Sequence, residues 1–477
     1  MRRFTNYKIS DMPIDLARIE LKQRQNSFNL PSGFNSEEFR ILANGFFQSE
    51  GHISCRIKGK YFIPIFVINQ NLYEKSSEFF LTLWHELGRT GSLTLTKNEQ
   101  GKLIIRLSSE NWDIILNKYA NYFNLIYGEK YISFQKLSRI RLLTNKKVPS
   151  TCSLYLAVTL VYSLSSHGKD RKISIKEQLN IFNLDERNKP TVDIFNYKDN
   201  SNTNLSIIFI IGLILGDGTL YLRLRKSNNN SIWLIPILLI PQIKDKYNDQ
   251  FLSLIKSYFH SSLNINSHIK THKTKEFDIR RNIGEKHFLE TLNINDSSNK
   301  SLVDGINQNT RSEMTVLTVE GQKFIFENLL LEMKSFSHYF YWKIDQYELL
   351  SRVATIVNVK GHLTLYGFKS IIEIIYSYPN ERKQTKDYWN QSIKSFFDNK
   401  AKSSISGENH IQFVSRPFKT NGKAKAWKCV FPNLSKIKSR EFGWLTTQTD
   451  SKLALQQAIK YRDSSIKTWI DTINRRG

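Results

Sequence analysis

The amino-acid sequence predicts an α+β protein made of two similar αββαββα units followed by a small basic module. One pattern occurs twice, at residues 36–58 and 205–226: an apolar helix ends at an acid and a glycine, and an alternating strand with basic residues follows. The two acids, Glu50 and Asp217, lie 167 positions apart, which is about one domain length. The repeat therefore indicates two equivalent units in one chain.

Apolar periodicity predicts the elements of each unit. Ser36 is expected to cap the first helix, and segments ending at Gln70 and Gln242 are expected to be second strands, each followed by an amphipathic helix. A further pair of strands is expected in each unit, at residues 92–96 with 103–108 and at residues 263–271 with 277–281.

Polar runs near residues 196–204 and 399–409 predict the breaks between segments. The expected segments are an N-terminal extension (1–34), the first unit (35–200), the second unit (201–398) and the basic module (399–477). The last contains strand patterns at 411–419, 426–432 and 440–445, and then a helix pattern, so three strands and one helix are expected there.

Composition narrows the class of protein. A net charge of +26, from 69 Lys+Arg against 43 Asp+Glu, favours a polyanionic partner such as nucleic acid. Three scattered cysteines argue against a disulfide framework or a structural zinc site. The apolar run at 207–215 is shorter than the roughly 20 residues of a membrane span, so no membrane association is expected. Heavy use of Asn, Ile, Lys and Tyr and the lack of an import signal favour an organelle-encoded protein, mitochondrial or else plastid.

Small residues on the two apolar helices predict a helix pair. Gly45 with Ser49, and Gly212 with Gly216, are four positions apart and share one helix face, so the backbones can approach closely. Glu50 and Asp217 would then emerge together, and a divalent cation would relieve their repulsion. Hard oxygen ligands suit Mg²⁺ (or Mn²⁺) and hydrolysis of a phosphodiester. The alternative is a core helix with a glycine cap, against which the repetition argues.

The alternating strands indicate a nucleic-acid surface. In each strand one face is apolar and the other carries polar or basic residues, namely Ser54, Arg56 and Lys58 in the first and Tyr221, Arg223 and Arg225 in the second. Antiparallel ribbons of this kind fit the major groove of DNA. An ordinary solvated strand face is the alternative for each strand taken alone.

The strings AxGFFQSEG at 43–51 and IIGLILGDG at 210–218 resemble the motif of the LAGLIDADG homing endonucleases, and the likeness extends over most of residues 35–398. The resemblance implies a pseudo-twofold DNA-binding saddle with Glu50 and Asp217 as metal-binding catalytic acids, one for each strand cut. It also implies a peripheral active-site lysine, for which Lys102 and Lys275 are the candidates. With 69 basic residues in the chain, an ordinary surface charge is the favoured alternative for both.

The C-terminal module resembles the ethylene-response-factor type of DNA-binding module, which also has three strands and a helix. Its candidate DNA contacts are Arg416, Lys419, Trp427, Lys428 and Arg440. A small basic domain of another kind is the alternative.

The sequence thus predicts an endodeoxyribonuclease, a monomeric intron-encoded homing endonuclease that cuts double-stranded DNA. The alternative is an intron maturase that binds intron RNA on the same scaffold. A DNA-binding regulator without activity would be expected to have lost one acid, whereas both are present.

Overall fold

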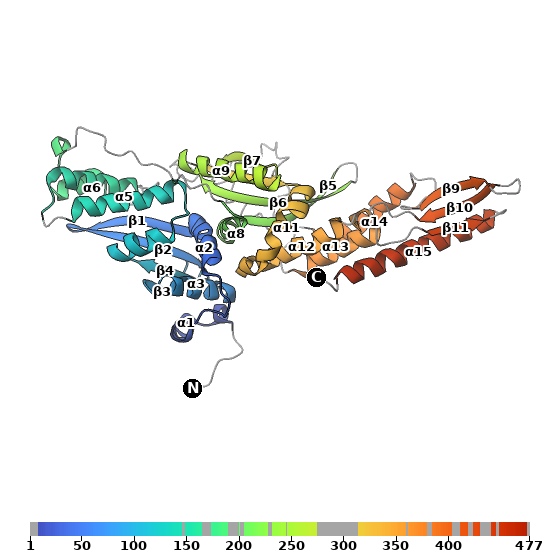
Figure 1. Cartoon of the computed structure of the whole chain (residues 1–477), viewed down its shortest axis with the longest axis horizontal. Helices are drawn as coiled ribbons and strands as arrows, with labels where there is room; N and C mark the ends of the chain where they lie inside the picture. The colour runs from blue at the N-terminus through green and yellow to red at the C-terminus, as the bar shows by residue number, and fades with distance from the viewer. Residues whose placement is uncertain are drawn as a thin grey trace, which may run out of the picture.

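The computed structural model contains two four-stranded antiparallel sheets with a helix pair between them, and a separate three-stranded sheet near the C-terminal end (Figure 1). This confirms the predicted α+β class with two αββαββα units. The structure describes residues 8–145, 148–164, 173–188, 200, 205–227, 231–244, 246–273, 313–358, 361–378, 384–402, 411–417, 423–429, 440–444 and 448–474.

The first unit has the predicted order of elements, and its sheet has the strand order β1-β2-β4-β3. The strands expected at 92–96 and 103–108 are confirmed. The N-cap is Asn35 and not Ser36, because the Asn35 side chain accepts the Glu38 amide at 3.2 Å. The elements are α2 (Ser36–Glu50), β1 (Gly51–Lys58), β2 (Tyr61–Asn71), α3 (Glu74–Glu86), β3 (Ser92–Lys97), β4 (Leu103–Ser109), a π-helical turn η2 (Ile114–Tyr119), α4 (Ala120–Tyr122) and α5 (Gly128–Thr144).

The second unit repeats this plan, with the sheet order β5-β6-β8-β7. The strand expected at 277–281 lies outside the described residues, and the partner of β7 in the sheet is β8. The expected strand start at Leu263 is wrong, because α9 continues to that residue. The elements are α8 (Ile207–Leu215), β5 (Thr219–Lys226), β6 (Ile232–Ile243), α9 (Lys246–Leu263), β7 (His268–Lys273), β8 (Glu313–Glu320), η6 (Lys323–Leu329), α11 (Leu330–Met333), η7 (Lys334–Lys343) and α12 (Ile344–Asn358).

Further helices extend each unit, and one of them crosses a predicted boundary. Within α14 (Lys386–Lys402), Trp389, Ile393 and Phe397 recur at helical spacing and are buried, so the helix continues beyond the boundary expected at residue 398. The linker expected at 196–204 lies, apart from Asn200, outside the described residues. The other additions are η1 (Ile9–Asp11), α6 (Thr151–Ser163), α7 (Ile175–Ile181), η4 (Glu186–Asn188), η8 (Gly361–Leu363) and α13 (Leu365–Ser377).

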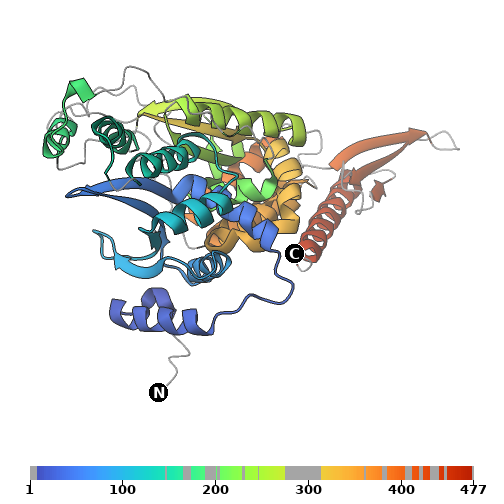
Figure 2. The ribbon, with the colours of Figure 1, turned by 60° about the vertical axis from the view of Figure 1, so that its left-hand side comes forward.

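The C-terminal module consists of β9 (Ile411–Pro417), β10 (Lys423–Cys429), β11 (Arg440–Trp444) and α15 (Gln448–Asn474). Its antiparallel sheet has β10 in the centre, so Trp427 pairs with both Phe413 and Phe442. The helix α15 packs along β10 and β11 and also contacts α13, which joins the module to the second unit (Figures 1 and 2).

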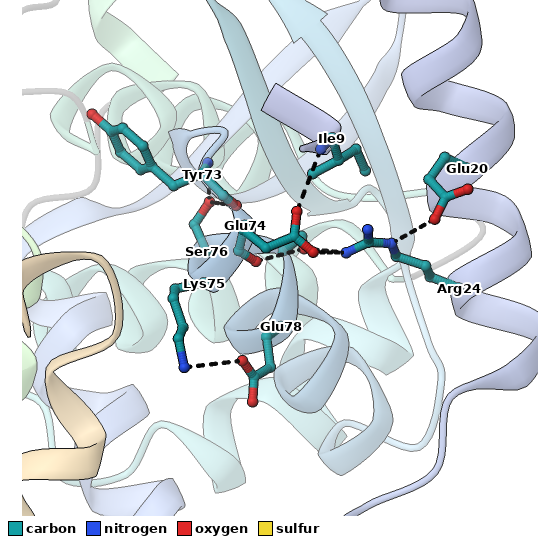
Figure 3. Close-up of polar contacts among 9 residues, drawn as sticks. Ile9, Glu20, Arg24, Tyr73, Glu74, Lys75, Ser76 and Glu78 are labelled. Atoms are coloured by element: carbon teal, nitrogen blue, oxygen red, sulfur yellow. Dashed lines mark hydrogen bonds and ion pairs between the residues drawn. The ribbon is translucent and has the colours of Figure 1, made fainter. Parts of the chain in front are cut away.

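The N-terminal extension forms α1 (Ile14–Ser27), which lies beside the edge strand β3 (Figure 2). Arg18 donates to the Leu95 carbonyl, and Arg24 forms ion pairs with Glu20 and with Glu74 of α3 (Figure 3). Glu74 also accepts the Ile9 amide at 3.3 Å. One carboxylate therefore holds both helical parts of the extension.

Glu74→Gln should loosen the extension and reduce stability by about 1 kcal/mol or less, because the ion pairs of Glu74 are partly exposed. Glu78→Gln is the matched control, since the ion pair of Glu78 with Lys75 is long, at 3.9 Å, and lies within α3 (Figure 3). Limited proteolysis of the N-terminus and thermal unfolding would measure both effects. Equal behaviour of the two variants would contradict the assignment.

Candidate active site and nucleic-acid interface

The helices α2 and α8 touch through their backbones. A Cβ atom added to Gly45 would lie 2.1 Å from the Phe209 carbonyl oxygen, and one added to Gly212 would lie 2.2 Å from the Leu42 carbonyl oxygen. One turn further on, Ser49 Oγ donates to the Leu213 carbonyl at 3.3 Å. Only glycine permits such an approach, and the small residues singled out from the sequence therefore lie at this contact.

The two carboxylates emerge at the same end of the helix pair. Glu50 is the last residue of α2, and Asp217 follows α8 by two residues. A Cβ atom on Gly216 would lie 3.1 Å from Cγ of Glu50, so the Glu50 side chain lies against the residue that precedes Asp217. Both carboxylates are partly buried. The structure thus brings the two predicted acids together.

Lys130, in the first turn of α5, lies at the end of the first motif. Its Nζ donates to the carbonyls of Phe47 and Ser49 at 3.0 and 2.7 Å. Burial lowers the pKa of the Lys130 ammonium to about 8, although the negative charges of Asp217 and Glu50 act to raise it. The effect of both carboxylates on one ammonium shows that the three charges share one site.

Lys343 occupies the corresponding place in the second unit. Its Nζ donates to the carbonyls of Ile214, Gly216 and Gly218 at 2.5, 2.7 and 2.7 Å. A cation at these carbonyls satisfies acceptors that a helix end leaves without intrahelical donors, and it opposes the negative end of the helix dipole. Each motif helix therefore ends at a carboxylate and a lysine.

The sequence interpretation missed these two lysines. Lys102 lies in the turn between β3 and β4, beside the N-terminal segment, and its amide donates to Asn98. Lys275 lies outside the described residues. The signal that could have identified the pair is an aromatic residue three positions before each lysine, in Tyr127-Gly-Glu-Lys130 and in Phe340-Tyr-Trp-Lys343. Lys130 lies in the first turn of α5, and Lys343 directly precedes α12.

The carboxylates fit a divalent cation. Glu50 and Asp217 supply hard oxygen ligands of the kind that Mg²⁺ prefers, and carbonyls of the helix ends lie beside them. Within the described residues, no group of three or more His, Cys, Asp and Glu side chains is arranged to hold a metal ion. A cation bound by two side chains keeps positions for water and for a phosphate oxygen of a substrate.

The open sheet faces carry the predicted strand residues. Lys58 and Arg225 are exposed, while Arg56 is paired with Glu110 at 2.7 Å. Arg223 is only 8% exposed and lies 3.9 Å from Glu320. The neighbouring positions are less open, since Ser54 is buried and Tyr221 is partly buried. The structure therefore leaves the cations at the strand ends most accessible.

Exposed aromatic residues lie opposite these cations at the tips of both hairpins. Tyr61 pairs with Lys58 and is 76% exposed, and Trp233 pairs with Arg225 and is 57% exposed. Each hairpin thus presents one cation and one aromatic ring at the same place. The sequence interpretation had not included either ring.

The predicted contacts of the C-terminal module are distributed over its sheet. Trp427 and Lys428 are in β10, Arg416 is in β9 and Arg440 is in β11. Lys419 lies outside the described residues.

Comparison with known proteins gives a match within the first unit. Residues 43–141 match the model of the LAGLIDADG endonuclease family, and this segment includes Glu50 and Lys130. No curated protein matches the chain. Among the helices in the described part of the chain, none combines the length and apolar character that a membrane span requires.

Several solved structures are similar to the chain. The I-LtrWI LAGLIDADG homing endonuclease bound to target DNA is 15% identical, with a TM-score of 0.47 over 73% of this chain and 100% of that one. I-SmaMI bound to uncleaved DNA in the presence of calcium ions is 17% identical, with a TM-score of 0.45 over 70% and 97%. I-SmaMI bound to cleaved DNA is 16% identical, with a TM-score of 0.46 over 70% and 95%.

Gly212→Ala should destabilise the protein by at least about 2 kcal/mol, because its Cβ would overlap backbone atoms of α2 and force the helices apart. Gly59→Ala is the control, since Gly59 has open space around it and a φ of +59°. This substitution should cost only the backbone strain of about 1 kcal/mol. Urea denaturation would compare them. A loss for Gly212→Ala no greater than that for Gly59→Ala would disprove the close contact.

The depressed pKa of Lys130 predicts a pH dependence of stability in EDTA. Between pH 8 and 10.5 the unfolded chain keeps the Lys130 proton while the folded protein loses it, so the free energy of unfolding rises with pH. The free energy of unfolding of the wild type should therefore rise relative to that of Lys130→Met by up to about 1.4 kcal/mol per pH unit in this window. Denaturation at several pH values would measure the difference. A constant difference would contradict the burial of this charge.

Proposed function

We propose that this protein is a sequence-specific homing endonuclease that makes a double-strand break in a long DNA site and uses Mg²⁺, or Mn²⁺, as its cofactor. The observation that carries the proposal is the convergence of Glu50, Asp217, Lys130 and Lys343 at one end of the α2–α8 pair. The family match over residues 43–141 and the net charge of +26 support it. We further propose that it acts as a monomer and is encoded within an organelle intron, in a mitochondrion or else a plastid.

In this proposal the acids, the lysines and the residues of the hairpins have different roles. Glu50 and Asp217 would hold the divalent cation, which stabilises charge on the attacking and leaving oxygens. Lys130 and Lys343 are held by the motif carbonyls beside the acids, where a cation can stabilise negative charge that develops on a phosphate. Lys58, Arg225, Tyr61 and Trp233 would engage the DNA away from the cut. The C-terminal module would add phosphate contacts as an ethylene-response-factor-like domain.

The two units in one chain permit an asymmetric DNA site. In the first sheet Lys58 of β1 pairs with Tyr61 of β2, and in the second sheet Arg225 of β5 pairs with Trp233 of β6. The two hairpins therefore present different side chains. The maturase alternative would use the same basic surface on intron RNA. Binding of intron RNA without cleavage of the intronless allele would favour the maturase.

Glu50→Gln and Asp217→Asn should each abolish double-strand cleavage of the intronless allele in Mg²⁺, because each removes one metal ligand and no contact with the DNA bases. DNA binding should remain within about threefold of the wild type, since one neutralised carboxylate changes few phosphate contacts. Supercoiled plasmid assays and gel shifts would separate the two effects. Parental cleavage by either variant would refute the assignment of that acid.

Replacing three cations of the C-terminal sheet, Arg416, Lys428 and Arg440, with Gln should flatten the log-log salt dependence of DNA binding by about 0.9 per phosphate contact that is lost. Cleavage at saturating protein should persist, because the acids lie in the preceding units. The matched control neutralises three exposed lysines outside the sheets, Lys22, Lys75 and Lys118. An unchanged slope in the first variant would exclude the module from DNA binding.

A further inference from the structure

The backbone adopts a positive φ two residues before each of the two active-site lysines. Gly128, two residues before Lys130, has φ +59°, and Tyr341, two residues before Lys343, has φ +36° with ψ −115°. A positive φ is strained for any residue with a Cβ, so Tyr341 must be stabilised by its surroundings. The residues packed against the turn at Tyr341 must therefore hold this backbone conformation.

The turn of the first unit packs into the second unit. The Tyr127 ring stacks on Phe251 of α9 with centroids 5.4 Å apart, and it meets Phe209 of α8 edge-on at 5.9 Å. A Cβ on Gly128 would lie 3.0 Å from Oδ1 of Asn248 in α9, so the backbone itself approaches the other unit. Tyr127 is almost fully buried at this contact.

The turn of the second unit packs into the first unit in return. The Trp342 ring lies 5.4 Å from Phe46 of α2 and 5.6 Å from Phe79 of α3, and Tyr341 lies 5.3 Å from the same Phe79. Phe79 and Phe251 are equivalent, since each lies nine residues after the last glutamine of the second strand. Each unit therefore contributes aromatic residues that pack against the other unit.

We propose that Tyr127 and Trp342 are positioning residues, through which each unit places the catalytic lysine of the other. Tyr127 precedes its lysine by three residues and Trp342 precedes its lysine by one, and with both turns docked each lysine Nζ reaches carbonyls of its own motif. The catalytic role of the lysines rests on the proposed function, whereas their placement does not. Neither half of the site is complete until both units have docked, which prevents a partly folded chain from nicking DNA.

The two placements differ in strength. Gln48 of α2 accepts the Tyr127 amide at 2.8 Å and donates to its carbonyl at 3.3 Å, so the first turn is also anchored within its own unit. Leu215 stands at the corresponding place in α8, 167 positions later, and has no such side-chain amide. Lys343 should therefore depend on the other unit more than Lys130 does.

Chemical acetylation of the full chain, followed by peptide mass spectrometry, tests the placement of each lysine without any need for cleavage. Trp342→Ala should raise the labelling rate of Lys343 about tenfold through local opening and change that of Lys130 less than twofold. Tyr127→Ala should raise the labelling rate of Lys130 more than that of Lys343. The ratio of the two increases should be smaller than in Trp342→Ala. Trp342→Phe and Tyr127→Phe each retain an aromatic ring at the contact and should raise the labelling rates less than the Ala variants do.

Equal gains at both lysines in either Ala variant, or no gain, would overturn the proposal, because the rings would then serve only general stability. Should an Ala variant fail to fold, the Leu variant at the same position carries the test. On target DNA with Mg²⁺, Trp342→Ala should slow the same strand as Lys343→Met does. A wild type that cuts neither strand would refute the proposed function and leave the labelling result to decide the positioning.

Discussion

The backbone contact between α2 and α8 is the constraint on which the rest of the molecule depends. Because Gly45 and Gly212 lack side chains, the two helices approach until carbonyl oxygens fill the places of Cβ atoms. The strand β1 begins directly after Glu50, and β5 begins two residues after Asp217. One contact therefore fixes the acids relative to each other and the two sheets on either side of them.

This arrangement concentrates unfavourable charge, and the lysines reduce it. A carboxylate at a helix C-terminus is repelled by the helix dipole, and two such ends meet here. Lys130 and Lys343 each supply positive charge to carbonyls at the end of the motif helix of their own unit, yet the pKa of Lys130 falls to about 8 because burial outweighs the attraction of the acids. The site thus holds opposed charges close together in a form that a metal ion and a phosphate can enter.

The sequence was sufficient for those features that local patterns encode. The end of α2 at Glu50, the end of α8 just before Asp217 and the strands of the first unit follow from periodicity, turn residues and repetition. The strand β8 could not be placed, because the long segment between β7 and β8 separates the partners and gives no register. The lysines were missed for a similar reason: Lys130 and Lys343 follow their acids at different distances, and only the tertiary fold brings them to the motif. The acids share a motif, whereas the lysines share only a position in space.

The differences between the units show how a duplicated fold can diverge within one chain. The first turn uses Gly128, which adopts a positive φ without strain, and Gln48, which binds the backbone of Tyr127. The second turn uses Tyr341 in a conformation that costs about 1 to 3 kcal/mol, which the packing of Tyr341 and Trp342 against the first unit must offset. Loss of the contact between units would therefore release the second turn more readily than the first. Coupling between the halves is unequal, because Gln48 binds the backbone of the first turn from within its own unit, whereas Leu215 at the corresponding place has no amide for the second turn.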